Sequence, residues 1–178
     1  GPNINAPMDA AANTAALDAM ERAQARAGEA DARERALIDA LARRHASDAG
    51  AERAALDAAY AEAMGKVAAR YPRYADIALL HAEALMNLSP WDYWEAAGAR
   101  PKGRTAEILA TLEKVLQRQP DHPGAIHFYI HIVEASARPG RALRYADRLG
   151  SLMPGAGHLV NMPFHIYYRV GQYKDAIE

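Results

Sequence analysis

Five of the seven histidines lie in two segments near the end of the chain, and their spacing suits shared chemistry. In the first segment, His127 and His131 are four residues apart, and Glu134 follows three residues later. A helix turns by about 100° per residue, so these three side chains would lie within about 60° of one another. A row of two imidazoles and a carboxylate on one helix face can bind a metal ion or exchange protons.

The second segment contains His158, Asn161 and His165, which also span about 60° of a helix. Two such helices packed about 8–10 Å apart would let the two rows meet. Imidazole pairs with a carboxylate suit divalent zinc, copper, iron or nickel. One interpretation is therefore a transition-metal site, formed by His127, His131, Glu134, His158 and His165.

Three other interpretations of the same residues stay open. The histidines could form a polar surface in which they bond to one another, to glutamates and to tyrosines, because polar pairs four residues apart are common on helices. Acid–base catalysis by histidine and glutamate is a weaker interpretation, since no nucleophile accompanies them. Capture of a peptide or protein is the third. The diagnostic metalloprotease motif His-Glu-x-x-His is absent, so whether the protein is an enzyme stays open.

The composition favours an all-α protein. Alanine is abundant and recurs at helical spacing, while Val, Ile and Thr are sparse. The formal net charge of −1 gives no reason to expect binding to nucleic acid. The chain has no cysteine and no apolar run of the roughly 20 residues that a membrane span needs. We therefore expect a soluble protein, with a cytoplasmic or a periplasmic location equally open.

Helical periodicity and its interruptions predict a series of helices joined by short connections. The expected helices cover residues 8–26, 31–45, 51–70, 74–88, 105–120, 123–136, 140–152 and 157–170, and a ninth begins at Tyr173. Residues 47–50 are expected to form a turn, and Thr105 is expected to be an N-cap. Residues 89–103 break the pattern with two prolines, two glycines and both tryptophans. So much aromatic surface indicates that this loop folds back on the helices.

The helix-ending prolines reveal a repeat. Pro120 and Pro154 are separated by about 34 residues, which is a period typical of helical repeats. The interval from Pro72 to Pro120 is longer, and it fits one such period plus an insertion. The loop at 89–103 supplies that insertion. The histidine-rich segments are then equivalent helices of successive repeats.

The end of the chain resembles tetratricopeptide repeats (TPRs). Gly171 followed by Tyr173 and Ala176 is similar to the turn of that repeat, and Ala142 takes the position of its small residue. The resemblance implies antiparallel helix pairs stacked as a right-handed solenoid over a single domain, residues 1–178. Its parts would be degenerate helix pairs (1–72), a repeat with the inserted loop (73–120), a full repeat (121–154) and a partial repeat (155–178).

In TPR arrays the first helix of each repeat lines a concave groove that captures a protein, peptide or small ligand. The resemblance therefore implies a binding module whose groove is lined by Glu83, His127, His131, Glu134, His158, Asn161, His165, Tyr168 and Arg169.

Four blocks of the chain also resemble large bacterial TPR proteins of largely unassigned function: residues 1–8, 82–94, 127–136 and 157–171. In those proteins we expect histidine where this chain has Asn161, which is a weaker metal ligand. The resemblance implies that repeats are missing on both sides. We therefore expect self-association through exposed repeat ends. Pro163 is expected to kink the helix that carries Asn161.

Overall fold

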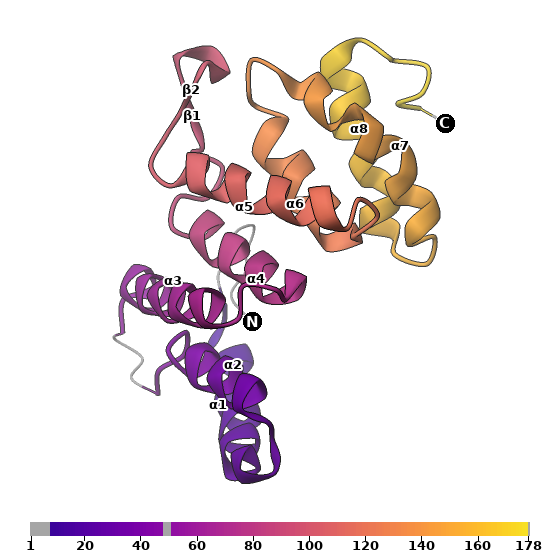
Figure 1. The fold of residues 1–178 in the computed structure, drawn as a ribbon. Helices are drawn as coiled ribbons and strands as arrows, with labels where there is room; N and C mark the ends of the chain where they lie inside the picture. The colour runs from indigo at the N-terminus through magenta and orange to yellow at the C-terminus, as the bar shows by residue number, and fades with distance from the viewer. Residues whose placement is uncertain (1–7, 48–50, 178) are drawn as a thin grey trace. The chain divides into compact units, whose positions relative to one another are not determined.

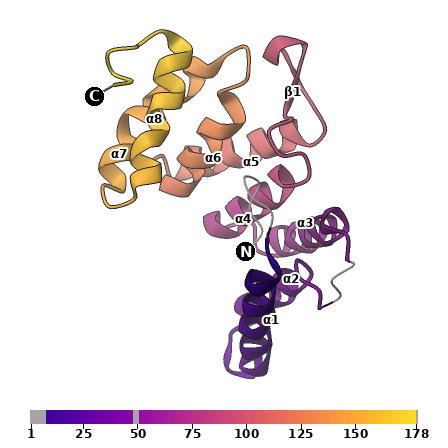
Figure 2. The ribbon, with the colours of Figure 1, turned by 180° about the vertical axis from the view of Figure 1, so that it is seen from behind.

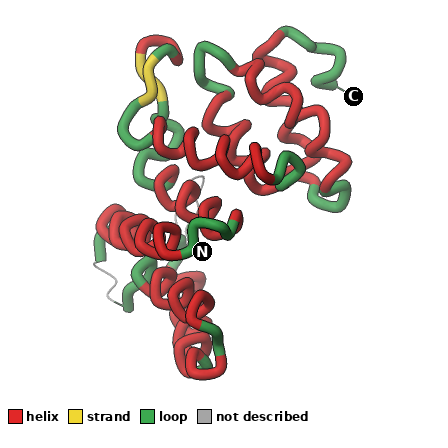
Figure 3. Tube along the Cα trace, in the orientation of Figure 1, coloured by secondary structure: helices red, strands yellow, loops and turns green. Residues whose placement is uncertain are grey.

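The computed structural model describes residues 8–47 and 51–177, and it is mostly helical (Figure 3). The predicted lead-in at residues 1–7 and most of the predicted turn at 47–50 lie outside the described residues. Internal contacts divide the chain into two compact units, residues 1–90 and 91–178. The boundary falls inside the loop predicted at 89–103. The single domain expected over residues 1–178 stays a prediction.

The first unit consists of four helices, α1 (Ala10–Ala25), α2 (Ala32–Ala42), α3 (Arg53–Arg70) and α4 (Ala75–Met86), each packed on the next (Figures 1 and 2). Asp9 caps α1 by accepting the backbone N–H of Ala12 at 2.7 Å. Asp31 and Glu34 form a reciprocal capping box at the start of α2. The buried residues of α3 and α4 include Tyr60, Ala61, Met64, Val67, Ile77, Ala82, Ala84 and Leu85.

One close approach explains a glycine within helix α3. A Cβ at Gly65 would lie 3.2 Å from Nε2 of His81 on α4. The missing side chain therefore leaves room for the imidazole between the two helices. The half-buried His81 thus packs between α3 and α4.

The second unit contains α5 (Thr105–Arg118), α6 (Pro123–Val133), α7 (Leu143–Leu152) and α8 (Gly157–Val170). Helix α6 contacts α5, α7 and α8, and α7 lies along α8 (Figures 1 and 2). A 3-10 turn at Pro139–Ala142 precedes α7, so this helix begins later than its periodicity predicts. The buried core includes Ile108, Leu112, Val115, Leu116, Ile126, Ile130, Ile132, Leu149, Met162 and Ile166.

The capping prediction for α5 is wrong. Thr105 is the first helical residue, Arg104 occupies the N-cap position, and the backbone N–H of Thr105 donates to the carbonyl of Lys102 at 3.0 Å. The hydroxyl oxygen of Thr105 is buried and has no hydrogen-bond partner among the described residues. Helix α5 begins one residue earlier than the sequence suggests, so the turn before it is one residue shorter and the threonine falls inside the helix.

A two-stranded hairpin, unexpected from the sequence, forms in the inserted loop. Strands β1 (Trp94–Glu95) and β2 (Arg100–Pro101) pair antiparallel, and each is too short to show an alternating pattern. Gly98 lies in the turn at φ +88°, where a Cβ would be 2.4 Å from the backbone nitrogen of Ala137. That nitrogen donates to the carbonyl of Gly98 at 2.9 Å. Only glycine allows this approach of the hairpin to the chain after α6.

The predicted folding back of the loop is confirmed for two of its three aromatic residues. Tyr93 is 2% exposed, and the indole N–H of Trp94 donates to the carbonyl of Ile132 at 2.6 Å. Trp91 is not enclosed in the core as Tyr93 is, since its side chain is 46% exposed.

Helix α8 ends at Gly171 in the left-handed conformation, with φ +82°, as the sequence predicts. The next N–H, of Gln172, donates to the carbonyl of Tyr167 at 2.9 Å. Residues 173–177 form turns rather than the predicted ninth helix, and one helical bond, from the N–H of Ala176 to the carbonyl of Gln172, is present there. Within the described residues, no helix combines the length and apolar character needed to cross a membrane.

Candidate functional site: a histidine cluster between α6 and α8

Three histidines from two helices meet in the second unit. His127 and His131 extend from α6 and His158 from the first turn of α8, and one ring nitrogen of each lies within 4.8 Å of the others. The Nε2 atoms of His127 and His158 are 2.9 Å apart, which is a hydrogen bond whose donor depends on the tautomers. The ring centroids of His131 and His158 are 6.0 Å apart. The cluster predicted from spacing is therefore present.

Local sequence places these rings. Pro123 begins α6 at a position where its missing N–H costs nothing, and His122 caps the helix by accepting the N–H of Ala125 at 3.4 Å. His122 is thus the N-cap of α6. On the buried side of α6, Ile126 and Ile130 are fully enclosed. Their burial fixes the rotation of the helix and turns the histidine row toward α8.

Glu134 lies beside the three-histidine cluster and holds two imidazoles. Its Oε1 is 3.3 Å from Nδ1 of His131, and its Oε2 is 2.7 Å from Nδ1 of His165 on α8. A carboxylate accepts, so each Nδ1 carries the proton, and Nε2 of His131 is left free to bind within the cluster. Metal-binding histidines are commonly oriented by an outer carboxylate in this way. The structure therefore gives Glu134 and His165, both predicted as ligands, a supporting position.

The electrostatic environment shifts the pKa values of His127 and of Glu134 downward. Burial, followed by the charges of His131, His158 and His165, lowers the pKa of His127 to about 3. Burial acts to raise the pKa of Glu134, but hydrogen bonds from His131 and His165 outweigh it and lower that pKa to about 2. At neutral pH, His127 is a neutral imidazole and Glu134 is an anion.

The pKa of His165 is shifted in the opposite direction, upward. Its hydrogen bond to Glu134 raises its pKa, against the effects of burial and of the positive charge on Arg169. His165 therefore favours the protonated form, and it pairs with the anionic Glu134.

Trp91 stands against the cluster and was not among the residues that the sequence assigned to the site. Its ring centroid is 5.4 Å from that of His131, with the planes at 77°. The residue has φ +63°, an unusual conformation for a side chain of this size. The sequence predicts only that the aromatic residues of this loop fold back on the helices, and nothing local distinguishes Trp91 from Trp94. The nearly half-exposed ring of Trp91 forms an apolar wall beside the histidines.

Asn161, predicted to share the site, lies elsewhere. It is exposed and lines a hollow together with α7 residues such as Ala146 and Asp147 and the turns after α8. Around the helix it is about 60° from His158, and this rotation turns it toward α7. Helix α8 continues through Pro163, which is buried.

Tyr168 and Arg169 occupy the exposed edge of α8. The ring of Tyr168 is 58% exposed, and it stacks on Phe164 at 5.9 Å and meets the edge of Tyr173 at 5.8 Å. Arg169 is exposed and follows His165 by one helical turn.

Glu83 belongs to the first unit, where it has a structural partner. Its Oε1 lies 3.1 Å from a guanidinium nitrogen of Arg44, which is 8% exposed. Arg44 also lies over the ring of Tyr60 at 4.8 Å and approaches Asp57 at 3.7 Å. A buried arginine needs such anionic partners, so Glu83 satisfies a charge in its own unit.

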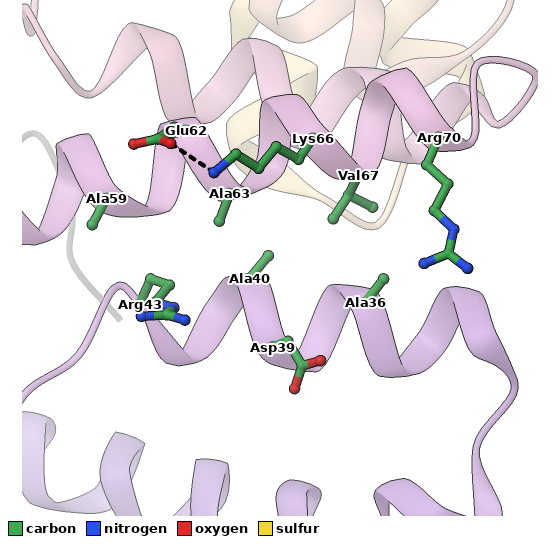
Figure 4. A pocket seen from close by; sticks show the side chains of 10 residues that line it. All are labelled: Ala36, Asp39, Ala40, Arg43, Ala59, Glu62, Ala63, Lys66, Val67 and Arg70. Atoms are coloured by element: carbon green, nitrogen blue, oxygen red, sulfur yellow. Dashed lines mark hydrogen bonds and ion pairs between the residues drawn. The ribbon is translucent and has the colours of Figure 1, made fainter.

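A further hollow is an open groove between α2 and α3 (Figure 4). Ala36, Ala40, Ala59 and Ala63 line its floor, and the charged side chains at its rim include the exposed pair Glu62–Lys66, at 2.7 Å. Small alanines and solvated charges bring no reactive group together. Unlike this groove, the histidine cluster brings together side chains that can bind a ligand or transfer protons.

No protein-family model, curated protein or solved structure matches the chain. The chemistry of the cluster therefore rests on its own geometry. It combines three imidazoles with an oriented outer carboxylate and exposure to solvent at His158.

Proposed function

We propose that the protein binds one divalent transition-metal ion through Nε2 of His127, His131 and His158. The observation that supports this is the approach of three imidazole nitrogens to within 4.8 Å of one another. Three imidazoles with a free fourth position are a donor set typical of zinc, and copper, iron and nickel also accept imidazole.

The surroundings of the cluster also favour a metal over a purely structural polar network. Metal binding needs neutral imidazoles, and the low pKa of His127, about 3, keeps that ring neutral. Glu134 holds the Nδ1 proton of His131 and so directs Nε2 toward the other rings. Tetrahedral coordination needs nitrogens about 3.4 Å apart, given bonds of about 2.05 Å. Binding would then replace the hydrogen bond between His127 and His158 with two coordination bonds.

We further propose that the site is built on TPR-like repeats stacked as a right-handed solenoid. Helices α6 and α8 begin at Pro123 and Gly157, one repeat period of about 34 residues apart, and they contact each other. The 3-10 turn before α7 begins at Pro139, which lies one such period after Thr105, the first residue of α5. Ala142, at the predicted small position, is fully buried. Successive repeats would thus supply the two histidine-bearing helices.

Metal titration of protein purified without a histidine tag tests the proposed function. We expect one equivalent of zinc per chain by calorimetry, confirmed by elemental analysis after dialysis. His131→Ala and His158→Ala should each weaken binding at least tenfold, while His45→Ala, which removes a histidine in the other unit, should leave it unchanged. Failure of the wild-type protein to retain stoichiometric zinc, copper, iron or nickel at neutral pH would refute the proposal.

A second function, capture of a protein or peptide by the same surface, is favoured by the exposed aromatic residues near the cluster. Phe164, Tyr168 and Tyr173 form a continuous ladder of rings, and Trp91 stands beside His131. Exposed aromatic side chains are typical anchors of protein interfaces. A partner bound in this way should be lost on Tyr168→Ala and kept on His131→Ala, whereas metal-dependent capture would be lost on both.

A further inference from the structure

We propose that the metal ion of this site activates a water molecule that hydrolyses carboxylic esters, and that Trp91 binds an aromatic group of the ester. This inference rests on the metal site proposed above and names its activity and its class of substrate. Three features carry it: a ligand set without charge, an opening to solvent at His158 and the exposed ring of Trp91.

The ligand set leaves the charge of the ion undiminished. The three ligands are neutral imidazoles when they bind a metal. Glu134 lies beside the cluster, but its two oxygens are engaged by Nδ1 of His131 and Nδ1 of His165, so it stays outside the coordination sphere. A zinc ion held by three histidines lowers the pKa of its bound water to about 7. Such a site therefore carries hydroxide, a strong nucleophile, at neutral pH.

The cluster opens to solvent on one side. His158 is exposed, whereas His127 and His131 are partly buried. A tetrahedral ion with three protein ligands keeps its fourth position for water or substrate. A small ester can therefore reach the ion past His158, at the first turn of α8.

Trp91 offers an apolar contact within reach of that fourth position. The residue is 46% exposed, and its ring centroid is 5.4 Å from that of His131. A coordinated ion lies about 3 Å from the centroid of its imidazole, given a bond of about 2.05 Å, so the indole centroid is no more than about 8.5 Å from the ion. A carbonyl carbon in position for attack by the bound hydroxide would lie about 3 to 4 Å from the ion. A phenyl group one or two bonds beyond that carbon can then meet the indole at the centroid distance of about 4.5 to 7 Å that aromatic pairs prefer.

The surroundings favour a neutral carboxylic ester over a phosphate ester. The transition state of ester hydrolysis develops one negative charge, which a single metal ion can stabilise. A dianionic phosphate ester needs further cationic groups, such as arginine or a second metal ion. The charges that act on His127 come from other histidines rather than from lysine or arginine. One ion beside an apolar ring therefore suits an uncharged ester.

The proposed reaction conserves atoms and charge. The oxygen of the metal-bound hydroxide bonds to the carbonyl carbon, the bond from that carbon to the alcohol oxygen breaks, and the departing alkoxide takes the proton of the hydroxide. The products are a carboxylate and an alcohol. A new water then binds the ion and loses one proton to solvent, which restores the hydroxide.

Ester hydrolysis by protein carrying one equivalent of zinc tests the inference. The substrates are trifluoroethyl phenylacetate and trifluoroethyl acetate, which share a leaving group and differ in the aromatic ring, and the released acid is followed by pH-stat titration. We expect a second-order rate constant at least tenfold above that of free zinc ions. Metal-free protein and His131→Ala should be inactive. kcat/KM should rise with pH through a midpoint near 7, because the hydroxide form increases.

Substitution of Trp91 tests the aromatic contact. Trp91→Ala should lower kcat/KM for the phenylacetate about three- to tenfold and leave that for the acetate within about twofold. Trp91→Phe keeps an aromatic ring and should retain most of the preference. Tyr74→Ala is the matched control, because Tyr74 is 45% exposed but belongs to the first unit, and it should change neither rate. Zinc affinity by calorimetry should stay within about threefold in these variants, which shows that each still forms the site.

Cobalt substitution gives a readout that does not depend on turnover. The visible absorption of a cobalt ion changes when its bound water ionises, so a pH titration of the cobalt-loaded protein should show a midpoint near 7. Zinc uptake without faster ester hydrolysis, or a bound water that does not titrate between about pH 6 and 9, overturns this inference alone. Equal losses for the two esters on Trp91→Ala overturn the assignment of an aromatic substrate. A protein that takes up no metal overturns the proposed function and this inference with it.

Discussion

Acidification should destabilise the second unit through His127, well before any carboxylate of the site titrates. The pKa of His127 is lowered to about 3 in the folded protein, mainly by burial, while an unfolded histidine titrates near 6.5. Below pH 6.5 the unfolded chain therefore binds a proton that the folded chain excludes. By linkage, the free energy of unfolding falls as the pH drops from 6.5 toward 3.

The size of this effect follows from the separation of the two pKa values. Each pH unit between them contributes about 1.4 kcal/mol, so the loss between pH 6.5 and pH 5 has an upper bound of about 2 kcal/mol. His127 is only half-buried, and water reaches the neighbouring His158, so solvent screening reduces the expected loss to about 1 kcal/mol. The pKa of Glu134 is about 2, so its contribution is lost only as the pH falls below its unfolded value, near 4.3.

Urea unfolding at pH 7 and pH 5 of the metal-free wild-type protein and of a His127→Gln variant measures the effect. The wild-type protein should lose about 1 kcal/mol more than the variant between these pH values. Comparing the two removes the contribution of His165, whose raised pKa acts with the opposite sign. Imidazole chemical shifts should show His127 neutral at pH 5. Titration of His127 near pH 6.5, or identical pH profiles for the two proteins, would refute the reasoning.

Two further substitutions test the supports of the site. Glu134→Gln removes the charge that orients His131 and His165, so zinc affinity by calorimetry should fall about 10- to 100-fold, and an unchanged affinity would contradict its supporting role. Gly98→Ala places a Cβ against the backbone after α6 and should lower the free energy of unfolding of the second unit by about 2 kcal/mol or more, measured by urea unfolding. Gly103→Ala, at φ +51° with open space around it, is the matched control, and it should cost about 1 kcal/mol. Equal losses in the two glycine variants would exclude the backbone clash as the cause.

The helices were predictable because their signals are local. The periodicity of apolar residues predicted the eight α-helices of the described residues. Pro72 and Gly171 end helices through their own backbone geometry, which does not depend on contacts with distant residues. The pairing of His127 and His131 follows from helix rotation alone. The approach of His158 also required the repeat spacing of the prolines, which correctly indicated that the helices carrying these residues lie together.

What the sequence could not supply depends on long-range contacts and side-chain rotamers. The role of Glu134 depends on both of its oxygens facing imidazoles from two helices, which spacing does not determine. Trp91 reaches His131 from a loop that lies well before α6 in the chain, and no local pattern indicates such a contact. Asn161 shows the opposite error, because a rotation of about 60° was enough to turn it toward another neighbour.

The bridge made by Glu134 has a mechanical consequence for α6 and α8. Apolar attraction is non-directional, so it constrains the offset of two helices only through the shapes of the packed side chains. A carboxylate whose two oxygens each hold a ring from a different helix resists sliding of one helix along the other, because a shift of one residue moves a side chain by about 1.5 Å and turns it by about 100°. Glu134 therefore restrains the offset of α6 and α8 along their axes. The offset that it favours is the one that brings the histidines of the two helices together.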